Sequence, residues 1–161
     1  RRVRDAADRE TEAVRRNEDE QWAVDWYFTG SEWALPLFEA ARQAILEAAG
    51  PGGSMTVQKT QIAFRIGPPG GCRPLQFAFL WLPRDGRRLP RAEGRPQRYL
   101  ALTFGLGRRE ENPRIAAASE PYPGRFTHHM SLGAPSDLDE TVRGWLREAA
   151  AFAVEKQRRR K

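Results

Sequence analysis

The sequence predicts an α+β fold: a two-layer sandwich in which an antiparallel sheet of about four strands carries two N-terminal helices and one C-terminal helix on one face. Three observations predict it. The chain has 161 residues, a length that one hydrophobic core can organise. Its segments follow the order helix, helix, four strands, helix. Short strands that return at regular intervals favour antiparallel pairing, and helices grouped before and after them favour a separate helical layer.

The N-terminal segment changes character after residue 20. Residues 1–20 alternate arginine with aspartate and glutamate and hold almost no large apolar side chain, so we interpret them as a charged helical extension. The following run, WAVDWYF, predicts a helix, and Trp22 and Trp26 fall on one helical face, which predicts that they pack in the core. The chain is therefore divided into an extension (1–20), a single α+β domain (21–155) and a basic tail (156–161).

Two further helices are indicated by their ends and by apolar stripes. Ser31 is a candidate N-cap for the second helix, Pro36 suits its first turn, and Gly50 ends it. The last helix opens with Ser136 as a candidate N-cap, and Asp139 follows three residues later in a pattern like a capping box. Apolar residues then recur at helical spacing, which makes this the clearest helix in the chain.

Four segments between these helices have strand character, and each is bounded by glycine, proline or charged turn residues. The second is apolar on both faces, which predicts a central strand, whereas the first and fourth alternate between apolar and polar residues. The four predicted strands are Met55–Ile66, Leu75–Leu82, Tyr99–Leu106 and Arg125–Leu132.

Alternation along the strands divides the sheet into two faces. His128 falls on the core face beside Phe126 and Met130 and is interpreted as a hydrogen-bonded core histidine, whereas His129 points to the opposite face. That opposite face gathers cations and neutral donors, and none of the four predicted strands contributes Asp or Glu. It therefore favours an anionic ligand, and the alternative is an ordinary solvated surface. The candidate ligand-binding residues are Lys59, Gln61, Tyr99, Thr103, Arg125 and His129.

The net charge of +6 is concentrated in two short clusters. The last six residues, KQRRRK, carry five of the positive charges, and the segment Arg84–Arg98 carries six arginines against two acidic residues. The rest of the chain is mildly acidic. Such clusters attract phosphates without specificity, so nucleic-acid contact through the Arg84–Arg98 loop and the Lys156–Lys161 tail is one prediction, and a solvated loop and tail is the alternative.

Few residues in the chain could carry chemistry. Two adjacent histidines on a strand cannot bind one metal ion together, and no spacing of histidines or cysteines supplies further ligands, so we expect no metal and no cofactor. His129 could act as a general base with Lys59 and Arg125 holding an oxyanion, but no carboxylate is indicated to orient it, so no catalytic residue is assigned. Cys72 lies in a glycine-rich turn without a motif and is typical of a bystander.

Location and partners are constrained by what the sequence lacks. The single cysteine allows no internal disulfide framework, and the sequence shows neither a secretory leader nor an apolar run that could span a bilayer. We therefore expect a cytoplasmic protein without membrane contact. The segment Arg1–Glu20 is a candidate for self-association or for docking a partner, because a helix of this composition must lie in solvent or against another surface.

Five segments match the pattern of a known family and follow its order over about residues 24–152. They are LFEAARQAI (Leu37–Ile45), VQKTQIAFR (Val57–Arg65), FAFLWLP (Phe77–Pro83), PGRFTHHMSL (Pro123–Leu132) and DLDETVRGWLREA (Asp137–Ala149). Together they resemble a bacterial family of domains of unknown function, family 5655, that is common in actinobacteria. The family pattern includes the K-T-x-I-A-F run and the paired histidines. The resemblance implies occasional fusion to nuclease-like modules of defence systems, but no established activity.

Three functional hypotheses follow from the sequence. The first is a small cytoplasmic, non-enzymatic binding or accessory module whose polar sheet face, centred on Lys59 and His129, receives an anionic group. The second is a small hydrolase or transferase that uses His129 together with Lys59 and Arg125. The third is a nucleic-acid-associated accessory domain that acts through the basic loop and tail.

Overall fold

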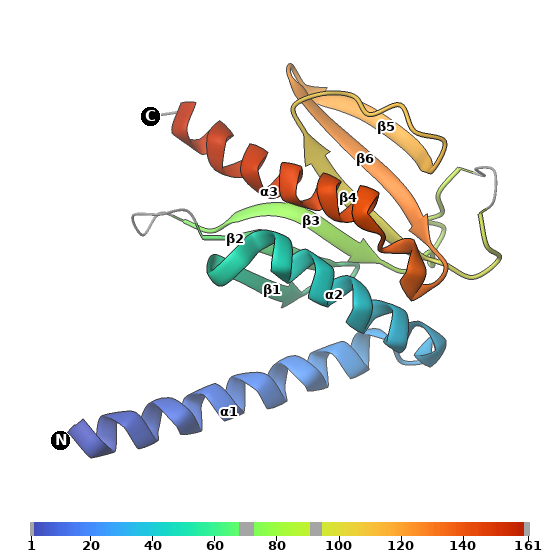
Figure 1. The fold of residues 1–161 in the computed structure, drawn as a ribbon. Helices are drawn as coiled ribbons and strands as arrows, with labels where there is room; N and C mark the ends of the chain where they lie inside the picture. Colours follow the sequence, from blue (N-terminus) through green and yellow to red (C-terminus); the bar gives the residue numbers. More distant parts are fainter. Residues whose placement is uncertain (1, 68–72, 91–94, 160–161) are drawn as a thin grey trace.

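A computed structural model describes residues 2–67, 73–90 and 95–159 of the protein (Figure 1). Six strands form one antiparallel sheet in the order β1-β2-β3-β4-β6-β5. The predicted α+β class is confirmed, but the sheet has six strands rather than about four. The strands are β1 (Gly53–Val57), β2 (Ile62–Ile66), β3 (Leu75–Trp81), β4 (Leu100–Leu106), β5 (Ile115–Tyr122) and β6 (Arg125–Leu132).

Two parts of the sheet differ from the sequence prediction. The predicted strand Met55–Ile66 is a hairpin, in which the turn between β1 and β2 is closed by a 2.8 Å hydrogen bond from the Gln58 N–H to the Gln61 carbonyl. No glycine or proline marks this turn, and the alternation of side chains continues through it. Strand β5 was not predicted, because it is rich in alanine and contains Pro121, and both residue types are poor strand formers. Proline is tolerated there because β5 is an edge strand.

Helices α2 (Leu35–Ala49) and α3 (Glu140–Arg159) lie side by side across one face of the sheet (Figure 1). Gly50 follows α2 with a φ of 73°, a left-handed conformation that glycine adopts without strain, so the predicted end of this helix is confirmed. No helix within residues 2–67, 73–90 and 95–159 is long and apolar enough to cross a membrane. Short 3₁₀ helices are η1 (Glu32–Ala34), η2 (Gly50–Gly52) and η3 (Pro135–Asp137).

The start of α3 is later than the sequence predicts. Asp139, not Ser136, caps the helix, because an Asp139 carboxylate oxygen accepts a 3.1 Å hydrogen bond from the Val142 N–H. This N–H donor, assisted by the Arg114 guanidinium 2.8 Å away, lowers the pKa of Asp139 below its ordinary value. Ser136 lies in η3, one turn before the helix.

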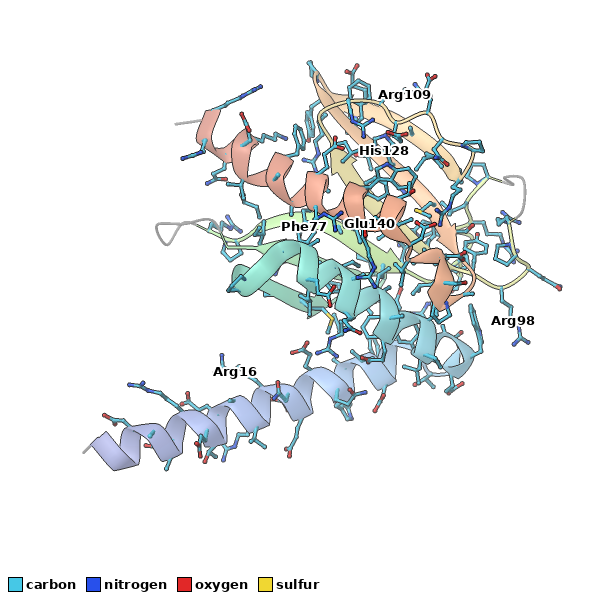
Figure 2. The ribbon with its side chains drawn as sticks, in the orientation of Figure 1. Arg16, Phe77, Arg98, Arg109, His128 and Glu140 are labelled. Carbon is cyan, nitrogen blue, oxygen red and sulfur yellow. The ribbon has the colours of Figure 1, made fainter. Side chains whose placement is uncertain are left out.

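The hydrophobic core lies between the sheet and the helices α2 and α3. Alternate residues of the central strands face these helices and are buried, so the predicted division of the strands into two faces is confirmed for β4 and β6. Figure 2 labels Phe77 and His128, which both lie on the face that α3 covers. Each fully buried large apolar side chain contributes about 1.5–3 kcal/mol to folding. Central members are Ile62, Phe64, Leu80, Leu102, Phe104 and Met130.

Helix α1 (Arg2–Tyr27) is one continuous helix, and its N-terminal half extends away from the sheet (Figure 1). Trp22 and Trp26 are 70% and 51% exposed, so the predicted packing of these tryptophans in the core is wrong. The sheet lies on one side of α1 only. Residues at helical spacing other than the two tryptophans occupy that side. The inward-facing residues are Val24, Tyr27 and Phe28.

Candidate functional site

The sheet opens between its two central strands. β3 and β4 pair only over residues 78–81 and 101–104, so the start of β3 and the end of β4 are not joined to each other. On the other side of β3, a register shift leaves Phe77 out of the pairing with β2, and irregularities of this kind bend and twist a strand. The C-terminal half of α3 lies over the opening (Figure 1).

A cleft of about 310 Å³ occupies this opening, a volume at the lower end of the range for ligand sites. Its three cations come from distant parts of the chain: Arg73 precedes β3, Arg125 begins β6, and Lys156 lies near the end of α3. None of the described residues that line the cleft is acidic. Two hydroxyls and four rings also line it: Thr103, Thr127, Phe77, Phe79, Phe104 and Phe152.

Arg125 is the central cation of the cleft. Its side chain is half-buried and lies across the neighbouring strand at Gly105, where a Cβ atom would come 3.8 Å from Arg125 Nε. Within the described part of the chain, no carboxylate forms an ion pair with Arg125. Lys156 lies beside it in the lining, with its ammonium 5.5 Å from the centre of the Tyr122 ring. The described lining of the cleft therefore has three cationic and no acidic side chains.

A chain of hydrogen bonds crosses the open face of the sheet next to the cleft. Trp81 Nε1 donates to Thr103 Oγ1 at 2.9 Å, and Thr103 Oγ1 lies 2.7 Å from His129 Nδ1. Because an indole N–H can only donate, the threonine proton is available to Nδ1, an arrangement that favours a neutral His129 with its own proton on Nε2. Thr103 then has no proton left for a ligand, so Thr127 is the hydroxyl donor of the cleft.

Burial lowers the pKa of His129 below its ordinary value, and the neighbouring His128 and the Arg87 guanidinium lower it further. Arg87 comes from the loop after β3, and its guanidinium carbon lies 4.6 Å from the centre of the Trp81 ring. His129 is therefore a neutral, half-buried group at pH 7 that is hydrogen-bonded to the Thr103 hydroxyl.

His128 belongs to the core and not to the site. It is completely buried, its Nε2 accepts a 3.0 Å hydrogen bond from the Glu110 N–H, and its ring stacks on Phe104 with a centroid separation of 5.3 Å. Burial is the main cause of the lowered pKa of His128. The interpretation of His128 as a hydrogen-bonded core histidine is confirmed, and the two adjacent histidines face opposite sides of the sheet.

Three of the six candidate residues from the sequence lie together, and three do not. Thr103 and Arg125 line the cleft, and His129 bonds to Thr103. Lys59 and Gln61 lie in the turn between β1 and β2. β3 and β4 stand between β2 and β6, so that turn is three strand spacings, about 14 Å, from the strand of His129.

The sixth candidate, Tyr99, is buried beneath the loop that joins β3 to β4. Its hydroxyl accepts a 3.0 Å hydrogen bond from the Leu89 N–H, and the Arg95 guanidinium carbon lies 5.2 Å from the ring centre. Together with Trp81 and Ala101 it forms a small second core on the open face. Tyr99 therefore holds the loop in place and does not line the cleft.

The arginines of the Arg84–Arg98 loop are largely engaged within the protein, although residues 91–94 lie outside the described range. Arg84 donates to the Tyr27 carbonyl at 2.9 Å and lies 4.4 Å from the Tyr27 ring centre. Arg87 and Arg95 donate to the carbonyls of Thr60 and Leu89, at 3.1 and 2.6 Å. Arg98 lies 5.9 Å from the Trp33 ring centre and is labelled in Figure 2.

The loop and the basic tail do not form one surface. Figure 1 shows the loop between β3 and β4 at one side of the molecule and the C-terminal end of α3 at the other. Residues 156–159 of the predicted tail continue α3, and residues 160–161 lie outside the described range. The two charge clusters of the sequence are therefore separate features.

Sequence reasoning missed Arg73, Lys156 and Phe152 as members of one site. Arg73 precedes a predicted strand and Lys156 was assigned to the tail, and no spacing in the sequence relates either residue to β6. Thr127 could have been included, because it alternates with Arg125 and His129 on the same face of one strand.

The geometry around His129 does not resemble a catalytic acid–base pair. Its described hydrogen-bond partner is a threonine hydroxyl, whereas a carboxylate commonly orients a catalytic histidine. Glu110 pairs with Arg108, and Glu120, which β5 adds to the sheet, accepts from the Gly124 N–H. Among the described residues, no group of three or more histidine, cysteine or acidic side chains could hold a metal ion.

Comparison with known proteins gives a family and no activity. A search of curated proteins and a search of solved structures found no match. The family model of a domain of unknown function, DUF5655, matches residues 24–153. The matched range includes α2, all six strands and α3 as far as residue 153, so most of the cleft lies within it and Lys156 lies beyond it. The chain therefore belongs to the DUF5655 family of domains of unknown function.

Proposed function

We propose that this domain is a small non-enzymatic binding or accessory module that receives an anionic group in the cleft between β3 and β4. The observation that carries the proposal is the one-sided charge of that cleft, where Arg73, Arg125 and Lys156 converge and no acidic residue is found among the described lining. Cations that gather in a concave site raise the local concentration of anions and bind them through charge-assisted hydrogen bonds.

The surroundings of Arg125 suit a phosphate or carboxylate group. A guanidinium presents two parallel N–H donors that match the oxygens of such a group. The Thr127 hydroxyl lies on the same strand face as Arg125 and can donate a further hydrogen bond. The rings of Phe79 and Phe152 limit the access of water, which strengthens electrostatic contacts inside the cleft.

The proposal moves the centre of the anion site away from Lys59 and His129. In this proposal His129 does not contact the anion but hydrogen-bonds to Thr103, which lines the cleft. Lys59 lies in the turn between β1 and β2, across the sheet. A cytoplasmic location in a bacterium is part of the same proposal. The single cysteine, which allows no disulfide framework, supports the location, and the family resemblance supports the source.

Titration of the purified chain with inorganic phosphate, sulfate and adenosine monophosphate, followed by calorimetry and by melting temperature, tests the proposal. We expect a rise in melting temperature with at least one of these anions. The variant Arg125→Gln should lose about tenfold in affinity, because a hydrogen bond to a charged group contributes about 1.5–3 kcal/mol.

Arg88→Gln is the matched control. Arg88 is exposed in the loop at the other end of β3 and carries the same charge, so its removal should leave anion affinity unchanged. Absence of a response to every anion, or equal losses in Arg125→Gln and Arg88→Gln, would contradict an anion site in the cleft.

A further inference from the structure

A second groove adjoins the cleft. It has a volume of about 720 Å³ and lies between the β5–β6 turn and the C-terminal half of α3. The groove shares Arg125, Phe152 and Lys156 with the cleft, so the two hollows meet at these side chains. A ligand larger than a single anionic group could therefore pass from one hollow into the other while contacting the same two cations.

The acidic side chains of the second groove are already paired. Glu148 accepts two hydrogen bonds from the Arg108 guanidinium, at 2.8 and 2.9 Å. Glu155 lies 3.6 Å from an Arg159 nitrogen, on the exposed side of α3. Five cations and two acidic residues are found among the described residues that line the two hollows, a positive balance that suits an extended polyanion.

Aromatic rings line the same hollows as these cations. Phe79 and Phe152 are half-buried, and among the rings that the structure describes neither stacks on another. Phe152 packs against Gly107, where a Cβ atom would come within 2.9 Å of the ring, so a larger residue at position 107 would displace the ring. An aromatic ring that stacks on no other described ring and lines a hollow together with two cations is the arrangement on which unpaired nucleobases stack.

We propose that the cleft and the second groove together bind a single-stranded nucleic acid. Consecutive phosphates contact Arg125 and Lys156, one base enters the cleft against Phe79 or Phe152, and the next nucleotide continues into the second groove. The bases of a duplex are stacked inside it and cannot enter a cleft of about 310 Å³, which favours a single strand. Polyphosphate and acidic peptides carry the charge but have no base to stack. This inference rests on the proposed function of the cleft.

Fluorescence anisotropy with a labelled oligothymidylate of about 12 nucleotides tests the inference on the full chain, because single-strand sites span about 4–16 nucleotides. We expect the oligonucleotide to bind at least about tenfold more tightly than thymidine monophosphate. Its log Kd should rise with log salt concentration with a slope of about 1.4–2, since each phosphate contact contributes about 0.7 and two or three cations of the cleft are in reach.

Two substitutions distinguish the binding of a nucleic-acid strand from the binding of a simple anion. Phe79→Leu keeps an apolar side chain but removes the ring. It should reduce the affinity for the oligonucleotide about tenfold more than the affinity for inorganic phosphate. Ala151→Glu places a negative charge in the second groove, where Ala151 is exposed. It should likewise reduce the affinity for the oligonucleotide about tenfold more than the affinity for phosphate. The control Thr141→Glu adds the same charge at the other end of α3 and should change neither affinity.

The outcomes distinguish this inference from the proposed function. If phosphate binds through Arg125 but the oligonucleotide binds no more tightly than the mononucleotide, the anion site stands and the nucleic-acid inference is wrong. The inference is also overturned if polyphosphate or a duplex of the same length competes as well as the single strand does. If neither phosphate nor the oligonucleotide binds, both proposals are wrong.

Discussion

The two ends of β3 are both rich in arginine, and they use it differently. After the strand, the loop arginines Arg84, Arg87 and Arg95 donate to backbone carbonyls, so their charge is committed to holding the loop. Before and beside the start of the strand, Arg73 and Arg125 line a cleft, and no described carboxylate pairs with either. A count of charges in the sequence favours the loop as a ligand site, whereas the contacts favour the cleft.

The contacts that an arginine makes, and not the number of arginines in its segment, decide whether it stabilises the fold or is available to bind a ligand. A guanidinium over an aromatic ring and hydrogen-bonded to a carbonyl stabilises the fold, and binding a ligand there would require breaking those contacts. A guanidinium whose N–H groups are not engaged by backbone carbonyls gains more from an anion than the loop arginines do. The two ends of β3 should therefore differ in mutational behaviour, as a stabilising end after the strand and a binding end at its start.

The largest expected effect is at Tyr27, which anchors the stabilising end. The Tyr27 hydroxyl accepts from the Leu82 N–H at 3.1 Å and donates to the Thr60 carbonyl at 3.2 Å, and the ring supports Arg84. Tyr27→Ala should lower the free energy of unfolding by about 3–5 kcal/mol, measured by urea denaturation. Tyr27→Phe keeps the ring and should cost about 1 kcal/mol. Equal costs for the two variants would show that the ring contributes nothing to the anchor.

Arg84 and Arg125 should show opposite patterns. Arg84→Gln loses a charge-assisted hydrogen bond and a ring contact at a half-buried site, so we expect a loss of about 1–2 kcal/mol in stability and no change in phosphate affinity. Arg125→Gln should keep stability within about 0.5 kcal/mol and lose phosphate affinity. Urea denaturation measures the stability of both variants, and calorimetry measures their phosphate affinity. Reduced phosphate affinity in Arg84→Gln would break the separation of the two ends.

The histidines predict a loss of stability in acid. Both have a pKa below the ordinary value of 6.5, so below about pH 6.5 the unfolded chain binds more protons than the folded chain. The free energy of unfolding should therefore be constant above that pH and fall as the pH drops towards the lowered native values. For the fully buried His128 the slope is at most about 1.4 kcal/mol per pH unit between its pKa values in the unfolded and the folded chain.

Arg87 links the loop to the open face and sharpens this prediction. Its charge is one cause of the lowered pKa of His129, after burial and His128. In Arg87→Gln the His129 pKa should move towards 6.5 while that of His128 stays in place, measured by NMR titration of the two imidazole rings. An unchanged His129 pKa would show that the Arg87 guanidinium does not act on the open face.

The smallest expected effect is at Arg88, the exposed arginine of the same loop. Arg88→Gln should change stability by less than about 0.5 kcal/mol and should leave phosphate affinity unchanged. A measurable loss of affinity would mean that the loop contributes its charge to ligand binding after all, and the two ends of β3 would no longer be distinct.

Local patterns were sufficient for much of the fold. β6 was predicted residue for residue, because alternating side chains bounded by a Pro-Gly turn favour a strand, and the core face of β4 followed in the same way. Of the candidate site, Thr103, Arg125 and His129 were predicted on one open face, where the register pairs Thr103 with His129. The turn at residues 58–61 was missed because it lacks turn residues, so Lys59 and Gln61 were placed on that face as well.

By itself, the sequence determined which residues can form strands, which strand faces are apolar, and where charge is concentrated, because these properties depend on neighbours a few residues apart. Only the tertiary structure decided which side of α1 is buried, that β3 and β4 separate after four paired residues, and that Lys156 of α3 lies beside Arg125 of β6. These relations join segments far apart in the chain. They depend on how the sheet twists beneath α3, and no local spacing records that twist.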